Sequence, residues 1–273
     1  MDYVEDPAGN RTTYIYDPAT GRRAAERDAL GKLTRYGYNE QGQVIRSWGD
    51  AVYPVRYVYD DIGRLVELHT FREGMAWAED TWPDDVPPDI TRWRYDPATA
   101  LLTAKVFADG TETTYGYAAG GGLAVRTWSR TGKNGDPLMT SYAYDPATGE
   151  LTAIDYSDDT PDIGFTFDRL GRLKTVTDAA GKRIFDYNGA LQLSSETIRG
   201  LYDRTLERRY AVSGVRGRPN GISMGVEYAV AYGHDDDGRF DSINWQTAGL
   251  SGMVNYAYLP ESDLLSGYAA DTG

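Results

Sequence analysis

Ring-bearing residues recur along the chain in pairs that are separated by one residue, and a turn-forming segment follows each pair. Residues two apart in an extended strand share a face, so both rings of a pair point the same way. Several steps between second rings are 20 to 22 residues (16 to 38, 95 to 117, 167 to 187), a length that fits two strands and two turns. The pattern predicts one array of about ten hairpin repeats over residues 1–273. The pairs are Tyr14/Tyr16, Tyr36/Tyr38, Tyr57/Tyr59, Trp93/Tyr95, Tyr115/Tyr117, Tyr142/Tyr144, Phe165/Phe167, Phe185/Tyr187, Tyr232/His234 and Tyr256/Tyr258.

The turn that follows the rings is written almost identically three times, as YDPATG at 16–21 and 144–149 and as YDPATA at 95–100. Asp opens such a turn because its carboxylate accepts hydrogen bonds from nearby backbone N–H groups. Pro fixes φ at the next position, and Gly closes the turn where φ is commonly positive. These features are typical of a β-hairpin. Ala100 stands where the other copies have Gly21 and Gly149, so we expect a distorted or longer turn there.

The ring-bearing face is the more constant face of each hairpin, and we predict that its aromatic rings stack against those of neighbouring repeats. The apolar residues after the turn are three apart, as in Leu65/Leu68 and Leu173/Val176. Either a β-bulge or a strand end would break the alternation in this way. No long segment combines helical periodicity with caps and freedom from Gly. The fold class predicted is therefore all-β, an antiparallel β-hairpin repeat array that forms a curved or spiral sheet.

The motif Y-x-Y-D-x-x-G-R-L, as in YVYDDIGRL (57–65) and FTFDRLGRL (165–173), resembles the RHS/YD-repeat family over nearly the whole chain. In bacterial toxin complexes and secreted polymorphic toxins of this family, a spiralled sheet closes into a shell around a toxic C-terminal domain. In the teneurin-like members a related shell is part of an adhesion receptor. The resemblance assigns a structural role to the following residues: Tyr14, Tyr16, Gly21, Tyr36, Tyr38, Tyr57, Tyr59, Gly63, Tyr95, Tyr142, Tyr144, Gly149, Phe165, Phe167 and Gly171.

Two features depart from the family. The D-P-x-G-L signature of the autoproteolytic segment is absent, so no cleavage residue is assigned. About ten hairpins are too few for a closed toxin-holding shell, and neither end carries an evident cap. We therefore expect a partial shell wall that belongs to a longer protein.

Composition narrows the classes of partner. The formal net charge is -13, which disfavours a nucleic-acid partner because phosphate binding needs clustered Lys and Arg. The absence of Cys excludes disulfides and thiolate metal sites, and no apolar run is long enough for membrane insertion. No signal peptide is evident; the chain is cytosolic, leaves by another route or is an excerpt, and the resemblance implies a secreted or cell-surface location within a longer protein. The 22 Tyr against six Phe suggest rings whose hydroxyl groups find partners or reach water.

Two segments interrupt the pattern. The longest insertion, 71–92, carries Trp77 and Trp82 with several acidic residues. These tryptophans are candidate ligand contacts for a glycan or a protein, but we favour a cover over a sheet edge or an opening. The irregular stretch 198–228 carries a local excess of Arg. Neutralisation of acidic neighbours is the favoured role for it, and an anion site is the alternative.

The sequence carries no enzyme signature. The stretch from His234 to Asp237 resembles a metal cluster, yet it aligns with an ordinary turn, and oxygen-only sites need converging ligands. No catalytic motif is present, so we predict no enzymatic activity, no catalytic residue, no cofactor and no metal. We expect a structural repeat segment whose partners are other repeats or domains of its parent protein. The alternative is an adhesion module that binds carbohydrate or a cell-surface receptor through the Trp-bearing insertion or a concave face.

Overall fold

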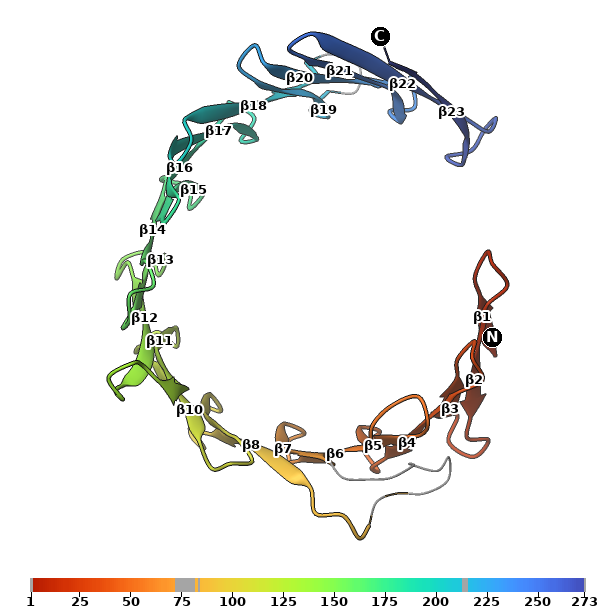
Figure 1. The fold of residues 1–273 in the computed structure, drawn as a ribbon, viewed down its shortest axis with the longest axis vertical. Coiled ribbons are helices and arrows are strands. Elements are labelled where there is room, and N and C mark those ends of the chain that lie inside the picture. The colour runs from red at the N-terminus through yellow and green to blue at the C-terminus, as the bar shows by residue number, and fades with distance from the viewer. Residues whose placement is uncertain (1, 72–81, 83, 213–215, 273) are drawn as a thin grey trace. The chain divides into compact units, whose positions relative to one another are not determined.

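The computed structural model describes residues 2–71, 82, 84–212 and 216–272 and contains 23 β-strands, with no helix in these ranges. The chain divides into two compact units, Met1–Met139 and Thr140–Gly273. Within each unit the strands pair with one another in chain order, as Figure 1 shows. The predicted all-β array of antiparallel hairpins is confirmed. The described residues form no helix long and apolar enough to span a membrane.

The first unit holds eleven strands, and each of the first ten is paired antiparallel with the next in the chain. They are β1 (Tyr3–Glu5), β2 (Arg11–Tyr16), β3 (Arg23–Arg27), β4 (Leu33–Tyr38), β5 (Val44–Trp48), β6 (Val55–Tyr59), β7 (Leu65–Thr70), β8 (Asp89–Tyr95), β9 (Leu102–Val106), β10 (Glu112–Tyr117) and β11 (Leu123–Thr131).

The second unit begins within β12 and continues the same antiparallel order to β23. Its strands are β12 (Pro137–Tyr144), β13 (Leu151–Tyr156), β14 (Ile163–Phe167), β15 (Leu173–Asp178), β16 (Gly181–Tyr187), β17 (Leu193–Gly200), β18 (Arg204–Tyr210), β19 (Pro219–Met224), β20 (Tyr228–His234), β21 (Phe240–Thr247), β22 (Leu250–Tyr258) and β23 (Leu265–Thr272).

Each repeat is a bulged hairpin. In eleven strand pairs the register shifts immediately before the second ring position. Tyr57 lies opposite Leu68 and Tyr59 lies opposite Leu65, so rings two apart meet apolar residues three apart. A β-bulge supplies the extra residue on the return strand, and of the two sequence explanations the bulge is confirmed.

The sequence pattern missed one of these hairpins. Strands β18 and β19 carry the bulge between Arg209 and Tyr210, although Arg208 replaces the first ring and Ala211 replaces the opening Asp. The stretch 198–228 therefore continues the hairpin order, and its irregularity lies in a longer turn closed between Ala211 and Arg218. The predicted insertion 71–92 also ends earlier than expected, because Asp89–Arg92 already belong to β8.

The turn after the rings is closed by backbone and carboxylate together. In the shorter form the Asp60 N–H donates to the Arg64 carbonyl at 2.9 Å, and the Gly63 N–H donates to the Asp60 carbonyl at 2.9 Å. The Asp60 carboxylate also accepts the N–H of Ile62 at 3.1 Å. Gly63 has φ 84°, the left-handed region in which Gly avoids the steric cost of a Cβ.

The expectation of a distorted or longer turn at Ala100 is wrong. The Ala100 N–H donates to the Asp96 carbonyl at 2.8 Å, the same distance as Gly149 to Asp145. Ala100 adopts φ 61°, so the alanine is forced into the glycine conformation. The strand ladder and the Asp96 carboxylate, which accepts the Thr99 N–H at 2.7 Å, outweigh the local preference of one alanine.

Replacing Ala100 by Gly should stabilise the first unit. The left-handed conformation costs a non-Gly residue about 1–2 kcal/mol, while the added freedom of Gly in the unfolded chain returns about 0.4–1 kcal/mol. We expect the free energy of unfolding in urea to rise by about 0.5–1 kcal/mol. In the control Ala98→Gly, the replaced residue lies in the same turn but has no positive φ, so this change should lower the free energy of unfolding. A lower free energy of unfolding in Ala100→Gly would contradict the conclusion that Ala100 is strained.

The sheet leaves much of its surface open. The buried hydrophobic side chains are few and mostly small, among them Ala25, Leu33 and Val176. Burial alone therefore supplies limited stability, and the contacts between neighbouring hairpins become important. Curvature of the sheet stays a prediction.

Candidate functional site

The recurring feature that ties one hairpin to the next is a hydrogen bond from the second ring. The hydroxyl of a second-ring Tyr donates to the carbonyl of the first residue of the preceding return strand, at 2.8–3.0 Å. That residue is the one opposite the preceding second ring in the ladder, as Val44 is opposite Tyr38. We call this contact the repeat junction. The bonds are Tyr38 to Arg23, Tyr59 to Val44, Tyr95 to Leu65, Tyr117 to Leu102, Tyr187 to Leu173, Tyr210 to Leu193 and Tyr258 to Phe240.

The Arg that follows the closing Gly, in G-R-L at 63–65 and 171–173 and in G-R-F at 238–240, completes the junction in three repeats. Arg64 Nε donates to the Asp60 carboxylate of its own turn at 2.7 Å. Its guanidinium carbon also lies 4.4 Å from the centre of the Tyr95 ring, which belongs to the next hairpin. A guanidinium over an aromatic face is attracted by the ring quadrupole. Arg172 makes the same two contacts, with Asp168 and with Tyr187 at 4.1 Å.

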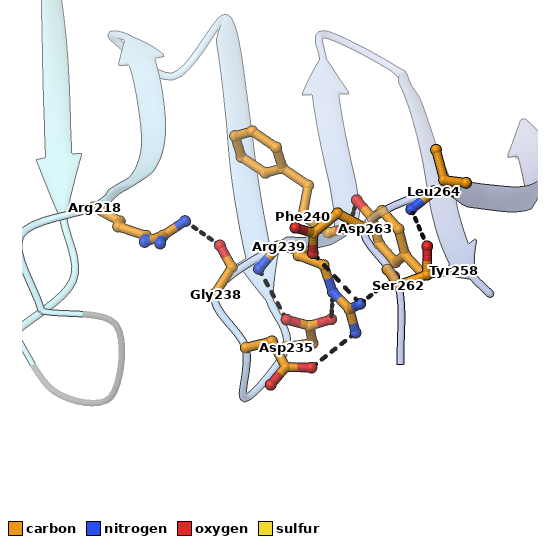
Figure 2. Close-up of polar contacts among 10 residues, drawn as sticks. Arg218, Asp235, Gly238, Arg239, Phe240, Tyr258, Ser262, Asp263 and Leu264 are labelled. Carbon is orange, nitrogen blue, oxygen red and sulfur yellow. Dashed lines mark hydrogen bonds and ion pairs between the residues drawn. The ribbon is translucent and has the colours of Figure 1, made fainter. Parts of the chain in front are cut away.

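Figure 2 shows the third example, in which Arg239 joins two turns of the second unit. Its Nε donates to Asp235 at 2.8 Å, and its Nη1 donates to the carbonyl of Ser262 in the next turn at 2.7 Å. The guanidinium carbon lies 4.6 Å from the centre of the Tyr258 ring. The Tyr258 hydroxyl in turn donates to the Phe240 carbonyl at 2.9 Å. One Arg thus fixes its own turn, the next ring and the next turn.

Gln and two further Arg residues reach the next turn without the Asp partner. Gln43 Nε2 donates to the carbonyl of Gly63 at 2.9 Å, and Gln192 Nε2 donates to the carbonyl of Gly217 at 2.7 Å. Arg22 donates to the Asn39 carbonyl at 2.8 Å, and Arg218 hydrogen-bonds the Gly238 carbonyl. In these turns the residue after the closing residue is therefore a Gln or an Arg whose long polar side chain donates to a carbonyl of the next turn.

These contacts explain the Y-x-Y-D-x-x-G-R-L motif and correct one expectation. In the junctions of Arg64, Arg172 and Arg239, the second ring meets a guanidinium and a carbonyl of the preceding repeat, where ring-on-ring stacking was predicted. The roles of Arg64, Arg172 and Arg239 were not predicted, although their recurrence after the closing Gly was the available signal. The excess of Tyr over Phe pointed correctly to partnered hydroxyl groups.

Phe167 interrupts the series because it occupies a second-ring position without a hydroxyl. The corresponding acceptor is the carbonyl of Leu151, which lies opposite the preceding ring, Tyr144. We expect Phe167→Tyr to supply the missing bond and raise the free energy of unfolding by about 1 kcal/mol. Phe165→Tyr, which adds a hydroxyl to the first ring of the same strand, is the control and should give no gain. Equal effects of the two changes would contradict the role of the second ring.

Hydrogen bonds at the turns lower the pKa of several opening aspartates. The backbone N–H groups of Thr20 and then Ala19 hold the pKa of Asp17 below its ordinary value. The N–H groups of Ala147 and Thr148 do the same to the pKa of Asp145. Each bond favours the ionised carboxylate, so the turns hold their aspartates in the charged form.

A lowered pKa gives a direction for acid sensitivity. A group whose pKa is lower in the folded chain stabilises the fold above its unfolded pKa, about 3.9 for Asp, and loses that contribution as pH falls through the folded value. We expect the free energy of unfolding to decrease as pH falls below about 4. Asn39 and Asn188 open the shorter form of the turn, in which Asn188 Oδ1 accepts backbone N–H bonds as Asp does, so Asp17→Asn/Asp145→Asn should fold and lose stability less steeply with acid. Identical slopes in urea titrations of the two chains would contradict this account.

The other candidate residues take up packing positions. Trp82 lies edge to face with Trp48 and Phe71, at centroid distances of 5.8 and 5.5 Å, and 5.0 Å below the Arg46 guanidinium. This geometry favours a packing role for the Trp82 side chain, and ligand contact by Trp82 stays a prediction. Trp77 lies outside the described residues. The aspartates after His234 form the predicted turn, with the Asp235 N–H bonded to the Arg239 carbonyl at 2.9 Å.

No group of three His, Asp or Glu side chains able to hold a metal ion occurs in the part of the chain that the structure describes. The arginines of 198–228 have local partners, which favours neutralisation over an anion site. Arg204 lies 3.6 Å from Glu227, and Arg208 lies 3.5 Å from Glu196. Arg209 donates to the Val230 carbonyl at 3.3 Å.

Comparison with known proteins finds no matching family model and no matching curated protein. Among solved structures, the chain is similar to TcdB2-TccC3 without its hypervariable C-terminal region, with 17% identity, 97% of this chain and 15% of that chain covered, and a TM-score of 0.45. It is also similar to the Photorhabdus luminescens Tc holotoxin pore, with 13% identity, 96% and 18% coverage and a TM-score of 0.33. The chain spans less than a fifth of the length of either protein.

Proposed function

We propose that this chain is a wall segment of an RHS-type shell or scaffold that encloses or presents another domain of a longer, secreted or surface-exposed protein. The repeat junction is the observation that supports this role most strongly. The recurring Tyr, Asp and Arg side chains are engaged in holding hairpins side by side. Residues used in this way build an extended sheet, as in other repeat arrays.

Protease protection in the full-length parent protein tests the role. If the segment is a wall, a domain behind it should resist a protease in the native protein. Tyr59→Phe/Tyr95→Phe/Tyr117→Phe, which removes three junction bonds, should accelerate its cleavage. First-ring replacements Tyr14→Phe/Tyr57→Phe/Tyr115→Phe should leave the cleavage rate unchanged. A parent in which every other domain is cut as fast in the native protein as after unfolding would refute the enclosing role.

The adhesion alternative has weaker support. Its proposed contact, Trp82, has two ring neighbours, and this packing accounts for the residue without a ligand. Binding of the chain to a glycan array that is lost in Trp82→Ala, with the fold retained, would raise the alternative above the wall. The absence of enzymatic activity also stays a prediction from the sequence.

A further inference from the structure

A strip of aromatic and basic side chains crosses four strands of the first unit, on the ring-bearing face of the sheet. It runs from β8 through β9 and β10 to β11. We call it the basic strip. Its members are Trp93, Lys105, Tyr115, Arg126, Trp128 and Arg130.

The strand register places the basic strip on one face. Lys105 lies opposite Trp93 on one side and opposite Thr113 on the other. Tyr115 is two residues beyond Thr113 and lies opposite Arg126. Residues directly opposite one another share a face, as do residues two apart along a strand. The same alternation carries the strip along β11 to its last two members.

The cations of the basic strip rest on aromatic rings. The guanidinium carbon of Arg126 lies 3.6 Å from the centre of the Trp128 ring, and that of Arg130 lies 5.3 Å from it. Lys105 Nζ lies 5.6 Å from the centre of Trp93. A ring attracts a cation without neutralising its charge, so all three groups keep their positive charge.

None of these three cations forms an ion pair with a carboxylate in the described ranges of the chain. Two Arg residues of β8 behave differently. Arg92 lies 2.8 Å from Glu67, and Arg94 lies 3.1 Å from Glu112. In a chain of net charge -13, a group of unpaired cations on one face is a local positive field.

The spacing of the cations fits an extended polypeptide. Because the guanidinium carbons of Arg126 and Arg130 lie 3.6 and 5.3 Å from the centre of the same Trp128 ring, they are at most about 9 Å apart. Side chains on one face of an extended peptide recur every two residues, or about 7 Å. Carboxylates two residues apart in such a peptide would therefore reach both guanidinium groups. Trp128 already contacts both Arg residues, so it is a poor free platform for the base stacking that a single-stranded nucleic acid would use.

We propose that the basic strip binds an acidic, extended peptide segment of a partner protein, with carboxylates on alternate residues. This inference goes beyond the wall function, which requires no ligand on this face. Arg126 and Arg130 would each bind a carboxylate of the peptide along β11. Lys105, which lies on β9, would bind a third carboxylate. Charge complementarity would supply the specificity and much of the association rate.

Calorimetric titration of the chain with a synthetic peptide of alternating Glu and Thr, about ten residues long, tests the proposal. Lys105→Gln/Arg130→Gln should weaken binding about tenfold. The matched control Arg92→Gln/Arg94→Gln removes the same charge from paired cations and should change binding less than about twofold. Circular dichroism should show the same sheet content in both variants.

Three outcomes would overturn the proposal. The first is equal weakening by the two variants, which would show a nonspecific charge effect. The second is equal binding of a peptide in which Gln replaces every Glu. The third is binding of a sulfated glycan or a single-stranded oligonucleotide without binding of the acidic peptide, which would assign the strip to another class of ligand.

Discussion

Removing three of the four junction hydroxyls of the first unit with Tyr59→Phe/Tyr95→Phe/Tyr117→Phe should lower its free energy of unfolding by about 3 kcal/mol. Each hydroxyl is part-buried and donates to a backbone carbonyl of the preceding hairpin at 2.9–3.0 Å. Burial raises the pKa of Tyr59 and of Tyr117, as expected for phenols withdrawn from water. A net loss of about 1 kcal/mol per hydrogen bond is typical, and urea denaturation followed by circular dichroism measures the sum.

The matched control removes three first-ring hydroxyls from the same unit. Tyr14, Tyr57 and Tyr115 donate no hydroxyl bond to another described residue, so Tyr14→Phe/Tyr57→Phe/Tyr115→Phe should change stability by less than about 0.5 kcal/mol. The two triple variants lose the same three oxygen atoms and keep all six rings. Equal losses in the two chains would remove the distinction between first and second rings.

Gly181→Ala should lower the stability of the second unit by about 3 kcal/mol. Gly181 has φ 121° and lies opposite Gly200 in the ladder between β16 and β17. A Cβ at this position would overlap the carbonyl oxygen of Arg199, so the backbone would have to move. The conformational strain of about 1–2 kcal/mol adds to an overlap cost of about 1–3 kcal/mol.

Gly149→Ala isolates the conformational part of that loss. Gly149 also has positive φ, at 77°, but a Cβ there would meet no atom within 4 Å. We expect about 1 kcal/mol for this change, measured by the same urea titration. If Gly181→Ala cost no more than Gly149→Ala, close packing between the ends of β16 and β17 would be contradicted.

Much of the local fold could be predicted from the sequence because each repeat contains the residues that specify its strands and turns. Ring pairs two apart, the Asp that opens each turn and the closing Gly all report on single strands or single turns. These signals are local in the chain. The hairpin at Tyr210 was missed because Arg208 and Ala211 replace its ring and its Asp, while neighbouring strands still impose the ladder.

The repeat junction could be predicted only in part. An excess of Tyr indicates partnered hydroxyls, but the acceptor is a backbone carbonyl, which carries no sequence signal. Its position follows from the β-bulge, which sets which residue of the return strand faces the next ring. Ala100 failed as a marker of a distorted turn for a related reason, since the paired strands outweigh the preference of a single residue.

The most direct test of the account is exchange of tyrosine hydroxyl protons, measured by nuclear magnetic resonance with residue-specific assignment. The account predicts slow exchange at the second rings that reach a part-buried carbonyl, such as Tyr59, Tyr95, Tyr117, Tyr187 and Tyr210, and fast exchange at Tyr57, Tyr115 and Tyr142. Fast exchange at every ring, or protection that follows the first rings, would contradict the claim that second-ring hydroxyls join the repeats.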